Sequence, residues 1–345
     1  PDPISSTQTL NVVATGSTDA DGDTVTYSYQ WFENGILVSA TGTSISATDL
    51  DVGEVWTVQV TPNDGYVDGN YTETSITISN SEPVISSVLI SSSDGGSSYN
   101  DSVLTCIASA TDADETVVPT YSWDVNGSIF IGASVDLSNY STMPGDSVSC
   151  TASVLDSNGG ADSSSAAENM DNRSPSVNSV TITPTVALSD SLLTCTSGSS
   201  DADGEAITAT YEWQIGSSFV GGNAELQLDN SLVIPGTIVD CIVSIEDESG
   251  ATDQASVSTT VQNSDPVLGA IFLTPIEPSL SDSISCTSSA TDIDGDTPSL
   301  SFSFTNQTSG AAYSATTVTT TSATLDLSST TAVSDDVIFC SVTAA

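Results

Sequence analysis

The sequence contains no histidine and no lysine, and Arg173 is the only basic side chain among its 345 residues. Without imidazole or amine groups, the chain has no histidine base, no Ser-His pair and no lysine for a Schiff base. Its formal charge of −44 excludes nucleic acid as a partner, because nothing here displaces counterions from phosphates. The same deficit argues against docking on anionic lipid, which requires clustered Lys and Arg.

Long hydrophobic runs are also missing. No stretch of about 18 apolar residues occurs, so we expect no membrane insertion. Hydrophobic residues nevertheless make up 37% of the chain, which is enough for packed cores. The N-terminus, Pro1-Asp2-Pro3, resembles neither a start site nor a signal peptide, so we expect a processed chain or a fragment.

An acidic motif returns at intervals of about 90 residues and defines an internal repeat. It begins six residues after each of four anchors, Val13, Cys106, Cys195 and Cys286. The four acidic clusters are Asp19, Asp21 and Asp23; Asp112, Asp114 and Glu115; Asp201, Asp203 and Glu205; and Asp292, Asp294 and Asp296. We therefore predict four tandem repeats, numbered 1 to 4, that comprise residues 1–81, 82–173, 174–264 and 265–345.

Other residues keep the same phase in each repeat. An aromatic residue follows the first anchor by 17 or 18 positions, and a second aromatic precedes it by two, which indicates one face of a strand. These residues are Trp31, Trp123, Trp213 and Phe304. A second anchor follows, at Val58, Cys150, Cys241 and Cys340. In three repeats a glycine stands five residues before it and predicts a turn that feeds the strand: Gly53, Gly145 and Gly236.

Short alternating stretches rich in Val, Ile and Thr, such as residues 55–60 and 179–183, fill each repeat. This pattern predicts about seven short strands and a β-sandwich. The Cys, Trp, Cys spacing resembles the immunoglobulin pattern, in which strands B, C and F carry the three residues. Acidic loops and Tyr-x-Trp followed by Asn-Gly (34–35, 126–127) resemble PKD-like and cadherin-like repeats of bacterial and archaeal surface proteins. The Trp-Asp-x-Gly-Asp-Gly signature of PKD repeats is missing, because Val-Asn-Gly follows Trp123-Asp124.

The predicted fold is therefore all-β, a tandem array of four immunoglobulin-like β-sandwich domains of which the first and last are incomplete. Repeat 1 lacks the first strand, equivalent to residues 83–90, and repeat 4 lacks the last strand, equivalent to residues 252–262. We expect a window from a longer repetitive chain. The alternative is polymerisation, in which a neighbouring chain supplies a missing strand.

Six cysteines permit fifteen connectivities. The repeat phase favours pairing within each sandwich, on facing core strands, as Cys106–Cys150, Cys195–Cys241 and Cys286–Cys340. Val13 and Val58 replace both cysteines of repeat 1, as expected if the two residues touch. Each crosslink would stabilise its domain by roughly 4 kcal/mol on the chain-entropy model, and disulfides indicate an extracellular location. The alternative is buried free thiols in a reducing compartment.

In an immunoglobulin-like sandwich the B–C and F–G loops lie at the same pole. The resemblance places the acidic clusters in B–C, and it places Asp64, Asp156 and Asp247 in F–G. The linker from the preceding repeat enters at this pole and bears Glu82 or Asp265. Such close carboxylates repel one another, so either their pKa values rise or a metal neutralises them. Calcium prefers six to eight oxygen ligands, and we predict Ca²⁺ between consecutive repeats.

The alternative to a metal is a solvated acidic turn that only aids solubility, and the repetition of the motif favours the metal. Glu115 replaces the glycine of the motif in repeat 2, so we expect an altered or weaker site there. The F–G loop of repeat 4 lies beyond the end of the sequence.

Three other features of the sequence suggest different functions. Six Asn-x-Ser/Thr sequons are possible glycosylation sites: Asn70, Asn100, Asn126, Asn139, Asn172 and Asn306. Tyr and Trp could form a sugar-binding platform, but those that keep the repeat phase are better explained as core. Paired carboxylates can serve a glycosidase, but their presence in every repeat indicates a structural part, so we expect no enzyme.

These observations predict a structural segment of an extracellular or cell-surface fibre, filament or adhesin stalk, stiffened by calcium and disulfides. Its partners would be copies of itself or adjacent repeats. The alternative is an array of binding modules that recognise glycans or a host or partner cell surface. Exposed aromatic residues in equivalent loops of several repeats would favour that alternative.

Overall fold

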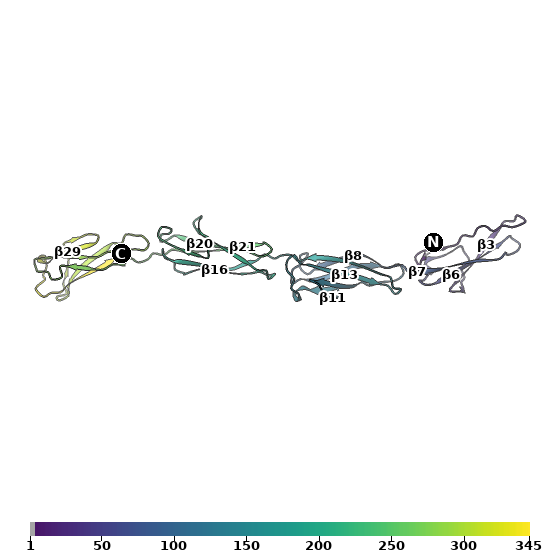
Figure 1. Ribbon diagram of the computed structural model, residues 1–345, viewed down its shortest axis with the longest axis horizontal. Coiled ribbons are helices and arrows are strands. Elements are labelled where there is room, and N and C mark those ends of the chain that lie inside the picture. Colours follow the sequence, from purple (N-terminus) through teal and green to yellow (C-terminus); the bar gives the residue numbers. More distant parts are fainter. Residues whose placement is uncertain (1–3) are drawn as a thin grey trace. The chain divides into compact units, whose positions relative to one another are not determined.

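The structure is a computed structural model, and it describes residues 4–345 (Figure 1). Over this range the regular elements are β-strands and three 3-10 turns, and no α-helix occurs. Accordingly, no helix in residues 4–345 is long and apolar enough to cross a membrane. The chain divides into two compact units, and the division falls between Asn172 and Arg173. The all-β prediction is confirmed, while the four repeat boundaries stay predictions.

The residues of repeat 1 that the structure describes form two sheets. The larger sheet has the strand order β1-β7-β6-β3-β4, and the smaller pairs β2 with β5. The strands are β1 (Ile4–Ser5), β2 (Leu10–Asn11), β3 (Thr26–Glu33), β4 (Ile36–Leu37), β5 (Ser44–Ile45), β6 (Val55–Asn63) and β7 (Thr72–Ser79). Ile4 and Ser5 form the short strand β1, which pairs in parallel with β7.

Repeat 2 completes the first unit with two sheets of three and four strands, ordered β12-β9-β8 and β11-β10-β13-β14. The strands are β8 (Val84–Ser92), β9 (Val103–Thr111), β10 (Thr120–Val125), β11 (Ser128–Ile131), β12 (Ser134–Asp136), β13 (Ser147–Leu155) and β14 (Ala161–Asn169).

Repeat 3, the first part of the second unit, has the same topology strand for strand. Its two sheets are ordered β15-β16-β19 and β18-β17-β20-β21. The strands are β15 (Ser176–Thr183), β16 (Leu192–Ser200), β17 (Thr208–Ile215), β18 (Ser218–Gly221), β19 (Glu225–Gln227), β20 (Ile238–Glu246) and β21 (Thr252–Thr260). Repeats 2 and 3 therefore share the two-sheet arrangement that the immunoglobulin-like spacing predicts.

Repeat 4 has three sheets, ordered β22-β25, β23-β24-β29-β28 and β27-β26-β30. The strands are β22 (Val267–Leu268), β23 (Phe272–Thr274), β24 (Ser283–Thr287), β25 (Ala290–Thr291), β26 (Leu300–Asn306), β27 (Ala312–Tyr313), β28 (Thr317–Val318), β29 (Ser322–Asp326) and β30 (Ile338–Ala344).

Alternation of side chains explains why these stretches become strands. In β13 and β20, residues at every second position are buried and the residues between them face outward. Asn126 and Gly127 join β10 to β11 with φ values of 50° and 81°, which the two-residue hairpin requires. Gly145 and Gly236 have φ values of 84° and 89° in the turns before β13 and β20. The predicted glycine turns are therefore confirmed.

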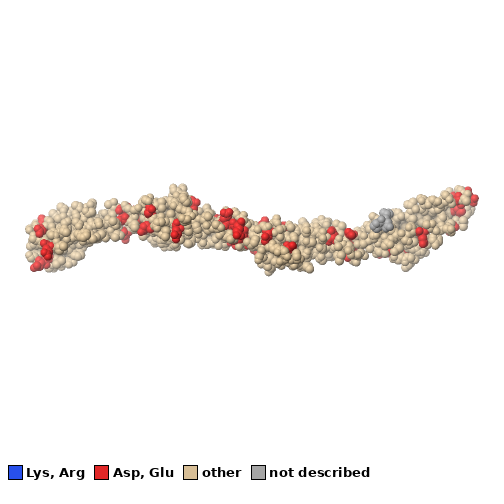
Figure 2. Space-filling model, viewed as in Figure 1, with Lys and Arg blue, Asp and Glu red and all other residues tan. Residues whose placement is uncertain are grey.

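Acidic residues concentrate outside the central strands. Figure 2 shows them in separate groups on the face that it draws. The long strands β9, β13 and β16 contain none. Because a carboxylate loses hydration when it is buried, this arrangement leaves the sheets free to pack an apolar core.

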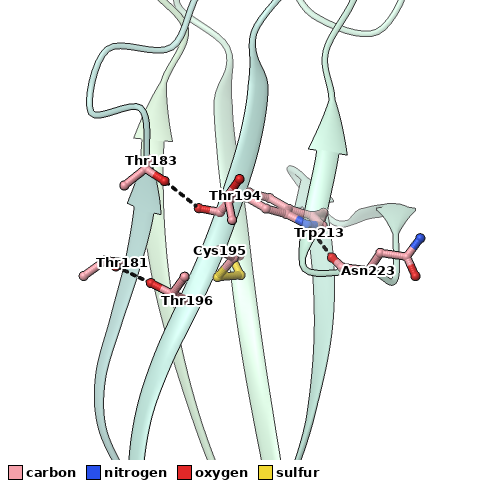
Figure 3. The surroundings of a disulfide bond; sticks show 8 residues. Thr181, Thr183, Thr194, Cys195, Thr196, Trp213 and Asn223 are labelled. Atoms are coloured by element: carbon pink, nitrogen blue, oxygen red, sulfur yellow. Dashed lines mark hydrogen bonds between the residues drawn. A yellow bond between two sulfur atoms is a disulfide. The ribbon is translucent and has the colours of Figure 1, made fainter.

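Each sandwich core contains the aromatic residue of the repeat. Trp123, Trp213 and Phe304 are at most 1% exposed, and Trp31 is 3% exposed. In repeat 3 the Nε1 of Trp213 donates a hydrogen bond to the carbonyl oxygen of Asn223 at 2.8 Å, close to the disulfide of Cys195 (Figure 3). The predicted core role of these aromatics is confirmed.

All three predicted disulfides form. Their Cα atoms are 6.3 Å apart in Cys106–Cys150 and 6.5 Å apart in Cys195–Cys241 and Cys286–Cys340. In repeat 3 the disulfide joins β16 of one sheet to β20 of the other. The crosslinks therefore connect the two layers of a sandwich, as the immunoglobulin-like spacing implies.

The prediction that Val13 replaces the first cysteine of repeat 1 is wrong. Val13 is 82% exposed. Leu10 pairs with Ile45 as Leu104 pairs with Val135, so the position of Cys106, two residues after Leu104, corresponds to Val12. One additional residue separates this position from the acidic cluster in repeat 1. A shift of one residue along a strand turns a side chain to the opposite face.

Candidate metal centre

Five acidic side chains are buried among the residues that the structure describes, and all five lie in the acidic loops that the sequence singles out. They are Asp203 at 3% exposure, Asp294 at 5%, Asp156 and Asp247 at 6%, and Glu205 at 8%. A buried carboxylate costs free energy unless hydrogen bonds or a cation compensate the lost hydration. The hydrogen-bond partners of these five carboxylates therefore decide which of their oxygens remain available to a cation.

The first aspartate of each B–C cluster folds its own loop. Oδ1 of Asp112 accepts hydrogen bonds from the backbone N–H groups of Asp114 at 2.7 Å and Glu115 at 3.1 Å. Oδ1 of Asp201 accepts from the N–H of Asp203 at 2.8 Å. The second oxygens, Oδ2 of Asp112 and Oδ2 of Asp201, are buried and have no hydrogen-bond partner. The same turn forms at Asp19 and Asp292.

The second aspartate connects its loop to the preceding repeat in the first unit. Oδ2 of Asp114 accepts a hydrogen bond from the backbone N–H of Ser81, in the linker, at 2.5 Å. Its Oδ1 accepts from the hydroxyl of Ser6 in repeat 1. A single carboxylate therefore receives donors from both the linker and the preceding repeat.

The second unit has the same joint, by which we mean a carboxylate that accepts hydrogen bonds from both the linker and the preceding repeat. Oδ2 of Asp294 accepts from the backbone N–H of Ser264 at 2.6 Å, and Oδ1 accepts from the hydroxyl of Ser189 in repeat 3. The two serines that contribute hydroxyls, Ser6 and Ser189, lie more than 100 residues before their partners, at separations of 108 and 105 residues. The recurrence of this contact makes the second aspartate a structural element of the junction.

Two of the F–G aspartates, Asp64 and Asp156, are stabilised in their charged form. The Asn80 side chain donates to Oδ2 of Asp156 at 2.7 Å, and this bond is the main cause that lowers the pKa of Asp156. Backbone N–H groups of Val67 and Tyr66 lower the pKa of Asp64. At these two positions the alternative of raised pKa values is wrong, because hydrogen bonds to the carboxylate favour ionisation.

The B–C and F–G loops do meet at one pole. In repeat 2, Oε1 of Glu115 accepts from the backbone N–H of Ser157 at 2.5 Å. In repeat 3, Oε1 of Glu205 accepts from the hydroxyl of Ser249 at 2.6 Å. Asp19 and Asp64 line one hollow of about 140 Å³ in repeat 1. The predicted juxtaposition is confirmed, and Glu115 makes the same bridge to the F–G loop as Glu205.

Asp201, Asp203 and Glu205 form the tightest acidic group. One oxygen of each lies within 4.8 Å of the others, and no other such group occurs in residues 4–345. Oδ2 of Asp201 and Oε2 of Glu205 are buried without a hydrogen-bond partner. Unpartnered buried carboxylate oxygens that converge in this way suit a hard divalent cation. These residues therefore fit calcium.

Several other predicted ligands are exposed. Glu82 is exposed, and its expected convergence with the loop stays a prediction. Asp265 is also exposed, but it lines a hollow of about 360 Å³ together with Asp292. The third acidic residues of two clusters, Asp23 and Asp296, are exposed, as is Asp21.

Sequence reasoning did not include Asn80, Ser6, Ser189 or Arg173 among the site residues. The asparagine was visible in the boundary pattern Asn-x-x-Pro, which recurs at 80–83, 172–175 and 263–266. Oδ1 of Asn80 is buried without a hydrogen-bond partner, so this amide is a further oxygen that fits a cation. No sequence pattern points to Ser6 or Ser189, since their contacts depend on the meeting of distant segments.

One sequon is wrong as a glycosylation site. Asn306 is fully buried, and its Nδ2 donates to the hydroxyl of Tyr313 at 3.1 Å and to Oδ2 of Asp336 at 2.8 Å. A glycan on this nitrogen would displace both contacts. Asn70, Asn126 and Asn139 are exposed, while Asn100 and Asn172 are half-buried.

Among solved structures, the chain is similar to tandem adhesin and cadherin repeats. No protein-family model and no curated protein matches it. A Ca²⁺-stabilized adhesin of an Antarctic bacterium is 17% identical over 98% of this chain and 93% of its own, with a TM-score of 0.32. The tetra-tandem repeat in the extending region of a large adhesion protein is 17% identical over 92% and 91%, with a TM-score of 0.30. Protocadherin gammaB7 EC3-6 is 12% identical over 87% and 84%, with a TM-score of 0.29. Because these TM-scores are low, the fold assignment rests on the strand orders and registers of the chain itself.

Proposed function

We propose that this chain is a structural segment of an extracellular fibre, filament or adhesin stalk, in which calcium at the junctions and disulfides inside the repeats maintain the geometry. The observation that carries the proposal is the joint at Asp114 and again at Asp294. Each carboxylate accepts hydrogen bonds from the linker and from the preceding repeat. A repeated joint of this kind limits the freedom of consecutive repeats, which is what a stalk requires.

The free oxygens beside the joints support calcium as the ion. Oδ2 of Asp112, Oδ1 of Asn80, Oδ2 of Asp201 and Oε2 of Glu205 are buried without hydrogen-bond partners. When bound, Ca²⁺ would supply positive charge and coordination to such oxygens. The chain itself forms the loop around them through the Asx turns at Asp112 and Asp201. One of the structurally similar proteins is itself described as a Ca²⁺-stabilized adhesin.

Three disulfides support an extracellular location, because disulfides persist in oxidising compartments. The alternative function, an array of glycan- or cell-binding modules, lacks a comparable observation. The large exposed aromatics, among them Tyr66, Phe219 and Phe272, do not occupy equivalent loops of successive repeats. We therefore propose the structural role in preference to the binding array.

The test is calorimetry and small-angle X-ray scattering of the purified chain in calcium and in chelator. We expect calcium at about 100 times its Kd to stabilise the repeats by about 2.7 kcal/mol and to increase the maximum dimension of the particle. Asp112→Asn should reduce the calcium-dependent gain, since it removes one charged oxygen and retains the turn. Asp49→Asn, at an exposed position outside the acidic loops, is the matched control for loss of one charge. Identical melting and scattering with and without calcium would refute the proposal.

A further inference from the structure

The single basic side chain of the sequence, Arg173, lies on the acidic group of repeat 3. Its Nε donates to Oδ1 of Asp203 at 2.9 Å, and its Nη2 lies 2.8 Å from the same oxygen. The backbone N–H of Arg173 donates to Oδ2 of Asp203 at 2.6 Å. The Asp203 side chain is fully buried, while that of Arg173 is 27% exposed. One residue therefore supplies donors to both oxygens of this carboxylate.

Within residues 4–345, the equivalent carboxylates have no such charge beside them. Asp114 and Asp294 receive the same backbone hydrogen bond, from Ser81 and Ser264. Their other oxygen accepts from a serine hydroxyl instead of a guanidinium. At the junction of repeats 2 and 3, a permanent cation thus takes the place of the neutral hydroxyl donor, while the backbone hydrogen bond stays the same.

The guanidinium also lies at the edge of the group that best fits calcium. Asp201, Asp203 and Glu205 bring three carboxylate oxygens within 4.8 Å of one another. With Arg173 included, the formal charge that a cation meets is −2 instead of −3. A calcium ion bound to Oδ1 of Asp203 would lie about 5 Å from the guanidinium, because calcium–oxygen distances are about 2.4 Å. Coulomb repulsion over that distance weakens binding roughly tenfold even with the dielectric constant of water.

We propose that Arg173 is a built-in counter-ion of this loop: it holds Asp203 in place when calcium is absent and lowers the calcium affinity of the Asp201–Asp203–Glu205 group. The inference rests on the proposed calcium function. It makes this loop less dependent on calcium than those at Asp112–Asp114 and Asp292–Asp294, whose second aspartates accept hydrogen bonds from neutral groups in the described part of the chain. A change in calcium concentration therefore acts on the acidic loops unequally.

Calcium titrations of the 345-residue chain test whether Arg173 lowers the calcium affinity of the Asp201–Asp203–Glu205 group. Comparison of wild type with Asp201→Asn isolates binding at this loop. We expect Arg173→Gln to increase the affinity of that component about tenfold. The reciprocal change, Ser264→Arg, should weaken calcium binding at the Asp292–Asp294 loop by a similar factor, since it keeps the backbone N–H and adds the charge. Ser264→Gln is its neutral control, and Ser264→Arg keeps the test valid if Arg173→Gln fails to fold.

Limited trypsin digestion tests the contact without any metal, because Arg173-Ser174 is the single site for this protease. Trypsin must take the arginine side chain into its own pocket, so a guanidinium held by Asp203 resists cleavage. In chelator we expect slow cleavage of wild type and at least tenfold faster cleavage of Asp203→Asn. Equal rates for the two proteins would overturn the inference.

The outcomes separate the inference from the proposed function. Calcium binding that Asp201→Asn abolishes, but that Arg173→Gln does not strengthen, overturns the counter-ion role and leaves the calcium function standing. Calcium binding with no component sensitive to Asp201→Asn, in wild type and in Arg173→Gln, overturns the counter-ion role alone, whereas absence of all calcium binding overturns both. Tighter binding in Arg173→Gln together with weaker binding in Ser264→Arg supports both.

Discussion

Trp31 in repeat 1 and Trp213 in repeat 3 occupy corresponding positions on β3 and β17, but the residues that close the core around them differ. Trp213 lies in a cluster with the disulfide Cys195–Cys241. Trp31 instead packs against a second tryptophan, Trp56, with ring centroids 6.4 Å apart and an edge-on angle of 69°. Strand registers pair Trp31 with Val58 and Trp213 with Cys241, so the position of Trp56 corresponds to Val239.

The two repeats also differ in the strand that covers the core. In repeat 3, β15 pairs with β16 and packs against β21. Repeat 1 has a hollow of about 300 Å³ at the corresponding place, lined by residues 12–15 and 72–74. A second hollow of about 230 Å³ is lined by Trp31, Trp56 and Val58. The core of repeat 3 is therefore closed by a crosslink and a covering strand, and the core of repeat 1 by a second tryptophan.

Replacement of the disulfide of repeat 3 by two valines should have the largest effect on stability. Cys195→Val together with Cys241→Val removes a crosslink that spans 46 residues. We expect a loss of about 4 kcal/mol in the stability of repeat 3, because the unfolded chain regains loop entropy. Native-state hydrogen exchange of peptides from β16 and β20 measures this loss, with β9 and β13 as internal controls. A loss below about 1 kcal/mol would show that the core, and not the crosslink, provides the stability.

Replacement of Trp56, the second tryptophan of repeat 1, should reduce stability by a somewhat smaller amount. Trp56→Val gives repeat 1 the residue that repeat 3 has at this position. Because Trp56 is 4% exposed and borders a hollow, we expect a loss of roughly 2–3 kcal/mol from lost burial and an enlarged cavity. Hydrogen exchange in β3 and β6 is the measurement, and exposed Val55→Ala is the control. Unchanged exchange would mean that Trp56 does not compensate for the absent disulfide.

The smallest expected effect concerns the covering strand and depends on pH. The pKa of Asp253 is lowered, first by the N–H of Val177 at the start of β15 and then by the N–H of Gln254. A lowered folded-state pKa means that this stabilisation is present above the unfolded pKa of about 3.9 and is lost as the pH falls through the folded value. We expect Asp253→Asn to lower the melting temperature of repeat 3 at pH 7 and to approach wild type near pH 2. Asp49→Asn is the control for charge, and a difference that stays constant between pH 7 and pH 2 would contradict this role.

Much of the fold follows from local patterns. Period-two alternation identifies strands such as β13 and β20, and Asn-Gly and Gly positions mark their turns, because backbone geometry is a property of adjacent residues. The disulfides follow from the repeat phase, since equivalent positions in tandem copies occupy equivalent places. Spacing fails at Val13. Repeat 1 has one additional residue before its acidic cluster, so the usual spacing leads to exposed Val13 instead of half-buried Val12.

The candidate site was predictable only in part. The Asp-x-Asp loops and F–G aspartates were identified because they recur, and their meeting at one pole follows from the sandwich topology. The linker acids were assigned by proximity in sequence, but the groups that reach the loops are Asn80 and the backbone N–H of Ser81. Asn306 matched a sequon, and burial alone disqualifies it.

By itself the sequence determined the repeat, the strand faces, the cysteine pairs and an acidity that leaves one cation in the chain. These properties depend on residue identity and on spacing along the chain, so they can be read linearly. The tertiary structure decided which oxygens lack partners, which serine meets Asp114 or Asp294, and where the guanidinium of Arg173 lies. These contacts join residues 30 to 108 positions apart. Their existence depends on loop conformation and side-chain reach in three dimensions, which the folded chain alone defines.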